Sequence, residues 1–121
     1  MNDFAESVIE EACLELLRDA GWATCHAELL EPEGSAPERA SYADVTLSGR
    51  LHSALVRLNP DLPASALDEA ARKVARLAGP DLVARNRTAH RMLVDGVDVE
   101  YRDAGGVIRG AQAQLIDYAD P

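Results

Sequence analysis

The stretch VDVEYRDAGG, residues 97–106, decides the fold class of this chain. Its first six residues alternate between apolar and charged side chains, which is the pattern of a strand with one solvent-facing side. The four residues that follow are typical of a tight turn. We therefore expect a C-terminal β-hairpin, with residues 107–118 as its second strand.

The residues before the hairpin follow a helical period instead. In four stretches the apolar side chains recur every three or four residues, which predicts amphipathic helices. The first runs from Asp3, as cap, to a stop at Gly21, and the others cover about residues 48–58, 65–78 and 81–95. Ser65, with an acid three residues later, is expected to open the third of these helices.

Two segments between the first two helices are less regular. Residues 22–26 predict a short strand, although their alternation is imperfect, and residues 30–44 predict a long loop with two prolines. The expected fold class is thus α/β (α+β), with an N-terminal helix, a short strand, three mid-chain helices and a C-terminal β-hairpin. The length of 121 residues and the 47% hydrophobic content predict a single domain over residues 1–121 with one core.

Composition also bounds the location of the chain. No apolar run reaches the roughly 18 residues that a membrane span needs, and the acidic first residues are unlike a signal peptide. We expect a cytoplasmic protein with no membrane partner. Cys13 and Cys25 are expected to be buried free thiols; a zinc site or a Cys-His nucleophile with His26 is the alternative that their spacing supports less.

The net charge of −9 is unevenly distributed along the chain. Residues 1–38 carry ten acids against one base, whereas residues 39–91 carry nine bases against five acids. An acidic chain argues against a free-standing, non-specific DNA-binding protein, but the basic middle permits one basic face. Arg85, Arg87 and Arg91 are the candidate nucleic-acid-binding residues; the alternative is a solvated or internally paired helix face.

The first helix carries the candidate metal ligands. Glu6 and Glu10 are one helical turn apart, so both carboxylates can point toward a common Mg²⁺ ion. The alternative is that these acids form a solvated face that complements the positive end of the helix dipole. Spacing alone favours that alternative.

The order of the landmarks resembles the N-terminal region of the R (endonuclease and motor) subunit of type I restriction enzymes. The resemblance covers essentially the whole chain in order. The segments that carry it are Ile9-Glu10-Glu11-Ala12, Leu14-Glu15-Leu16-Leu17, Gly21-Trp22, Pro37-Glu38-Arg39-Ala40-Ser41-Tyr42, Arg50-Leu51, Ala54-Leu55, Leu58-Asn59-Pro60, Leu62-Pro63, Asn86-Arg87, His90, Leu93-Val94, Gly96-Val97, Val99-Glu100-Tyr101-Arg102, Gly110 and Leu115-Ile116-Asp117-Tyr118.

The resemblance implies part of a nuclease domain of the PD-(D/E)xK kind, truncated before its catalytic strands. The full-length protein would be an ATP- and Mg²⁺-dependent endonuclease and translocase acting on double-stranded DNA, assembled with methylation and specificity subunits. The Asp and Glu-x-Lys motif is absent here, since the only lysine, Lys73, has Ala71 two residues before it. We therefore expect no cleavage by these residues and no bound cofactor.

The resemblance also gives Glu10 a role, because it matches the first-helix glutamate that points toward the metal site in such nucleases. It would help to position Mg²⁺, with Glu6 as a weaker candidate. An unpaired sheet edge in such a fragment makes self-association an expectation. The alternative function is a free-standing, non-enzymatic binding or regulatory module, including an acidic DNA mimic.

Overall fold

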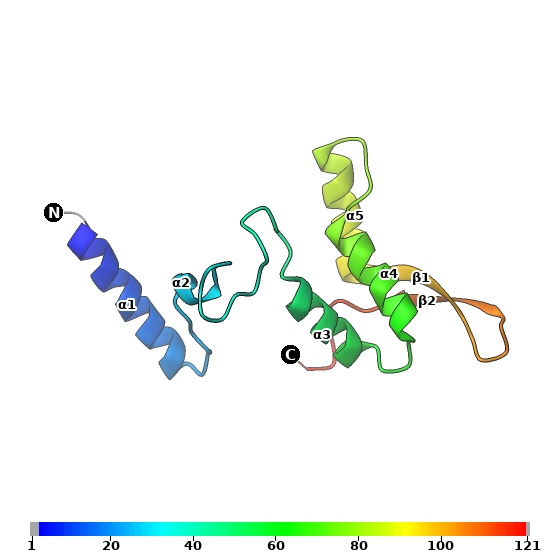
Figure 1. The fold of residues 1–121 in the computed structure, drawn as a ribbon, viewed down its shortest axis with the longest axis horizontal. Coiled ribbons are helices and arrows are strands. Elements are labelled where there is room, and N and C mark those ends of the chain that lie inside the picture. The colour runs from blue at the N-terminus through cyan, green and yellow to red at the C-terminus, as the bar shows by residue number, and fades with distance from the viewer. Residues whose placement is uncertain (1–2, 121) are drawn as a thin grey trace. The chain divides into compact units, whose positions relative to one another are not determined.

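A computed structural model describes residues 3–120 of the chain (Figure 1). The described part contains five helices and a two-stranded antiparallel sheet, which confirms the α+β class. It divides into two compact units, residues 1–43 and residues 44–121. None of the helices in residues 3–120 is long and apolar enough to cross a membrane.

The first unit contains α1 (Asp3–Asp19) and the short α2 (Ala27–Leu30). As predicted, α1 ends before Gly21, which lies in the turn after the helix and adopts a positive φ of 91° that favours glycine. The amide of Gly21 bonds to the carbonyl of Arg18, and the amide of Trp22 bonds to that of Leu17. These two bonds satisfy carbonyls that the end of the helix would otherwise leave unpaired.

Two predictions for this unit are wrong. Residues 22–26 form no strand, because no described segment of the unit pairs with them. Cys13 and Cys25 are free, but both are exposed rather than buried. No described side chain of residues 6–43 is buried, so the apolar face of α1 is not covered within its own unit.

The second unit consists of α3 (Ser48–Leu58), α4 (Ala64–Ala75), α5 (Leu82–Asp95), β1 (Val97–Arg102) and β2 (Ile108–Ala113). The predicted bounds of α3 and α5 are confirmed. The N-cap of α5 is Asp81, whose side chain accepts the amide of Ala84 at 2.8 Å. Such a cap satisfies one of the unpaired amides in the first helical turn.

Helix α4 differs from its prediction at both ends. It begins at Ala64 after Pro63, whose extended backbone suits an N-cap, and the expected cap by Ser65 is not formed in the described chain. It ends at Ala75 rather than near Gly79, with Arg76 leaving the helical conformation.

The hairpin is confirmed, with Val97 opposite Ala113 and Arg102 opposite Ile108. Its turn is held by Asp103, whose Oδ1 accepts the amides of Gly105 at 2.9 Å and Val107 at 3.0 Å.

The core lies where α4 packs between α3 and the hairpin (Figure 1). The alternation predicted for β1 is borne out, because its inward side chains Val97 and Val99 are 1% and 2% exposed. Seven hydrophobic residues form the buried cluster: Leu55, Ala66, Leu67, Ala70, Val97, Val99 and Ala113. The small side chains on α4 let this helix approach the sheet closely. This close approach places other side chains of α4 within reach of the backbone at the edge of β1.

Strand β2 ends at Ala113, five residues before its predicted end. The partner of Ala113 is Val97, the first residue of β1, so no strand residue is left to pair with Gln114. The buried side chain of Asn59, at the end of α3, bonds to Gln114 instead. Its Nδ2 donates to the Gln114 carbonyl at 3.0 Å, and its Oδ1 accepts the Gln114 amide at 2.7 Å.

Candidate functional site

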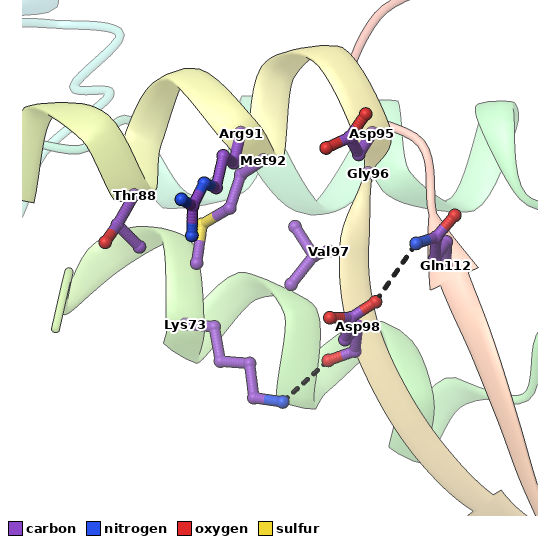
Figure 2. A pocket seen from close by; sticks show the side chains of 9 residues that line it. All are labelled: Lys73, Thr88, Arg91, Met92, Asp95, Gly96, Val97, Asp98 and Gln112. Atoms are coloured by element: carbon purple, nitrogen blue, oxygen red, sulfur yellow. Dashed lines mark hydrogen bonds between the residues drawn. The ribbon is translucent and has the colours of Figure 1, made fainter.

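A polar hollow of about 320 Å³ lies where α4, α5 and the hairpin meet (Figure 2). Arg91 and Asp95 line it from α5, Lys73 lines it from α4, and Asp98 and Gln112 line it from the two strands. The core packing of α4 against β1 brings these side chains together. The hollow therefore combines residues from four elements.

Lys73 is the cation that this packing holds most closely. Its Nζ donates to the backbone carbonyl of Asp98 at 2.6 Å (Figure 2). The same atom lies 2.8 Å from the Oε1 of Glu69, one helical turn earlier. The hydrogen bond from Lys73, followed by the bond from the Glu100 amide, lowers the pKa of the Glu69 carboxyl below its usual value. Glu69 is thereby kept ionised and Lys73 is kept in place.

Charges of both signs face this hollow. The carboxylate of Asp98 accepts a hydrogen bond from Gln112 at 3.2 Å, and Asp95 adds a second acid beside the cations Lys73 and Arg91. Two acidic and two basic side chains line the hollow, so their formal charges cancel. The hollow can accommodate a polar group, but it has no net positive field of the kind that draws in a phosphate backbone.

The structure separates the three candidate DNA-binding arginines. Arg87 and Arg91 lie one turn apart on α5, so they share a face, and both are exposed. Arg85 lies two residues before Arg87, which turns it to another side of the helix. Its Nε donates to the carbonyl of Gly79 at 3.1 Å and supports the loop that precedes α5.

The candidate metal ligands lie in the first unit, on α1. Glu10 and Glu11 line a hollow of about 300 Å³ with His26 and Glu28, whereas Glu6 is exposed one turn earlier. Glu11 is engaged on both sides, at 3.5 Å from Arg18 and 4.0 Å from His26.

In the described residues, no three His, Cys, Asp or Glu side chains are placed to hold a metal ion together. Carboxylate oxygens suit Mg²⁺, but the described residues do not assemble a complete site for it.

Sequence reasoning missed two of the polar side chains that organise the second unit. Glu69 has a detectable signal, because a Glu four residues before a Lys on a helix favours an ion pair. The only sequence signal at Asn59 is its position before Pro60, which predicts the end of a helix. It does not predict the partner that the Asn59 side chain binds.

Comparison with known proteins identifies the class. The chain belongs to the family described as the N terminus of the type I restriction enzyme R protein, which it matches over residues 3–121. The resemblance seen in the sequence is thereby confirmed.

Two individual proteins are also similar to the chain in sequence. The chain is 34% identical over 100 residues to the type I restriction enzyme HindI endonuclease subunit of Haemophilus influenzae, covering 83% of this chain and 10% of that protein. It is 31% identical over 98 residues to a protein named as the type I restriction enzyme MjaIXP endonuclease subunit of Methanocaldococcus jannaschii, covering 81% and 9%. The chain thus spans about a tenth of the length of these relatives. No solved structure matches it significantly.

Proposed function

We propose that this chain serves as the N-terminal part of an endonuclease and motor subunit in a type I restriction complex. The observation that carries the proposal is the family match over residues 3–121, together with two relatives that are named as endonuclease subunits. The whole protein would cut and translocate double-stranded DNA with Mg²⁺ and ATP. It would work in the cytoplasm with methylation and specificity subunits.

These 121 residues are not expected to cut DNA by themselves. Nucleases of the PD-(D/E)xK kind use an Asp and a Glu-x-Lys motif, and the sequence has no Glu two residues before Lys73. Lys73 is instead bonded to Glu69 and to the Asp98 carbonyl, which uses its ammonium for structure.

The direct test incubates the purified chain with supercoiled duplex DNA, Mg²⁺ and ATP, and measures nicked and linear products. We expect no cleavage above the buffer control. Cleavage that survives further purification and stops on addition of EDTA would refute this part of the proposal.

Glu10 is proposed to position Mg²⁺ in the whole protein. In support, its carboxylate lines a hollow on α1, whereas the neighbouring Glu11 is engaged by Arg18 and His26. Glu6, one turn away, is the weaker candidate for the same task.

The experiment for Glu10 needs the natural reading frame that contains this sequence. A frame that continues into an Asp and Glu-x-Lys motif and helicase motifs supports the proposal, whereas a stop codon directly after Pro121 favours a free-standing binding module. In the longer protein we expect Glu10→Ala to slow DNA cleavage. The matched control is Glu15→Ala, an exposed glutamate on the same helix. Equal cleavage by the Glu10 variant and the control would exclude the role of Glu10.

Arg87 and Arg91 are proposed to contact the DNA backbone, with Arg85 as a lesser candidate because it supports the loop before α5. Replacing Arg87 and Arg91 together by Ala in the longer protein should lower the slope of log affinity against log salt by about 2, because each lost phosphate contact lowers it by about 0.9. An unchanged slope in a binding titration would assign these arginines to a solvated face or to docking on another domain.

A further inference from the structure

The outer edge of β1 is bonded to two side chains of α4. The carbonyl of Asp98 accepts the Lys73 ammonium at 2.6 Å, and the amide of Glu100 donates to Glu69 Oε2 at 3.2 Å. Glu69 and Lys73 are in turn paired with each other at 2.8 Å. We call these two side chains the edge clip.

The edge clip imitates a neighbouring strand. In an antiparallel ladder, alternate residues direct their backbone groups toward the paired strand and away from it. Asp98 and Glu100 belong to the set that faces away from β2, since their backbone groups bond to α4. A third strand would offer an acceptor to the Glu100 amide and a donor to the Asp98 carbonyl. Glu69 and Lys73 supply this same pair.

We propose that the edge clip prevents β1 from pairing with β1 of a second copy of this chain. A strand edge with unpaired amides and carbonyls is a template for intermolecular pairing, and charged side chains at the edge are a common way to block it. The self-association expected from the sequence is then conditional. It requires that Glu69 and Lys73 leave the edge.

The charge pattern of β1 favours a second copy as the blocked partner. Antiparallel pairing centred on Glu100 would place Asp98 of each copy opposite Arg102 of the other, in two symmetric contacts between opposite charges. Residues 98, 100 and 102 share the outward-facing set, so this register also aligns their backbone groups for hydrogen bonding. Glu100 of one copy would lie opposite Glu100 of the other, and repulsion between these like charges keeps the association weak.

The test removes the edge clip and measures the molecular mass in solution. The variant Glu69→Ala with Lys73→Ala leaves the net charge unchanged. In sedimentation equilibrium over a concentration series, its average mass should rise from that of the wild-type chain toward twice 13.0 kDa. The dissociation constant of the dimer should fall by at least about tenfold, as unblocking the edge removes a competing interaction.

A matched control lies one position earlier on the same helix. Asp68 and Arg72 are also an acid and a base four residues apart on α4, and both are exposed. Replacing both by Ala removes the same charges without touching the edge of β1. This control should keep the mass distribution of the wild-type chain.

A third variant tests whether β1 is the surface that associates. Adding Glu100→Pro to the clip-less variant removes the amide that faces away from β2, a position where an edge strand tolerates proline. We expect the mass to return to the wild-type value.

Three outcomes would overturn the proposal. The first is a folded clip-less variant with the mass distribution of the wild-type chain, and the second is equal association of the Asp68 and Arg72 control. The third is independent of any substitution: hydrogen exchange in the wild-type chain should protect the Glu100 amide, and exchange at the rate of an unstructured amide would show that the edge is not clipped. None of these results depends on DNA cleavage.

Discussion

Replacing Asn59 by Ala is expected to destabilise the second unit by about 2 kcal/mol. The Asn59 side chain is 7% exposed and makes three hydrogen bonds, to the Leu55 carbonyl and to both backbone groups of Gln114. The Leu55 carbonyl keeps a partner, because the backbone amide of Asn59 also bonds to it at 3.0 Å. The amide and carbonyl of Gln114 lose theirs, at about 1–3 kcal/mol for each unsatisfied group. Gln114 is itself exposed, so we take the lower value for each.

The assay is urea or thermal unfolding followed by circular dichroism. For a unit of this size, a loss of about 2 kcal/mol lowers the unfolding midpoint by about 8–16 °C. The control is Asn86→Ala, the same change at an exposed position of α5, which should leave the stability unchanged or raise it by a few tenths of a kcal/mol, because Ala has the higher helix propensity. A change below about 0.5 kcal/mol for Asn59→Ala would place it among ordinary surface substitutions and refute the reasoning.

The variant Asn59→Asp separates the donor from the acceptor. It retains an oxygen for the Gln114 amide but replaces the Nδ2 donor by a carboxylate oxygen beside two carbonyls. Burial beside these carbonyls should raise the pKa of the new carboxyl, since a protonated acid can donate to one of them. Its stability deficit should therefore shrink as the pH falls, whereas the deficit of Asn59→Ala should not.

Three further predictions concern the core, a helix end and the hairpin turn. Leu55→Ala should cost about 2–5 kcal/mol in denaturant unfolding, because Leu55 is 1% exposed and the core cannot collapse fully onto the smaller side chain. Gly96→Ala should lower the thermal midpoint, since Gly96 has a φ of 88° and an added Cβ would lie 2.9 Å from the Ala113 carbonyl oxygen. The pKa of Asp103 is lowered by the Arg109 hydrogen bond and then by backbone amides, so its contribution to stability is present above about pH 4 and lost as the pH falls through its folded pKa. Asp103→Asn should consequently lose less stability than wild type on acidification, and equal pH profiles would contradict this.

Local sequence patterns predicted the elements whose causes are local. The hairpin follows from the alternation of residues 97–102 and from the turn residues after them. The bounds of α5 follow from Asp81 as the N-cap and Gly96 beyond the last turn. Each of these signals acts within a few residues, so it does not depend on how the rest of the chain packs around the segment.

The wrong predictions concern features that need a partner elsewhere. A strand at residues 22–26 would require a second segment to pair with, and the pattern of those residues says nothing about one. The end of β2 is set by where β1 begins and by the Asn59 side chain, and neither is visible in residues 107–118.

The candidate site was predictable only in part. The sequence indicated Glu10 and the arginines as residue types suited to metal and phosphate, and the structure places them on α1 and α5. It does not bring Arg85 onto the face of Arg87 and Arg91, because Arg85 lies two residues before Arg87 on the helix. Arg85 instead donates to the Gly79 carbonyl in the loop before α5. The edge clip joins residues of α4 to a strand later in the chain, and Glu69 and Glu100 lie 31 positions apart.

The sequence alone therefore determined the family, the order of helices and strands, and which face of β1 is apolar, because these depend on composition and on short-range spacing. Only the tertiary structure decided which polar groups satisfy the ends and edges of those elements. The Asn59 amide reaches Gln114 across 55 residues, and Lys73 reaches the Asp98 carbonyl across 25. The physical reason is that an unpaired backbone amide can donate to any correctly placed acceptor, and an unpaired carbonyl can accept from any correctly placed donor. Packing of α4 on the hairpin and of α3 on α4 sets which side chain lies there, and no local pattern reveals it.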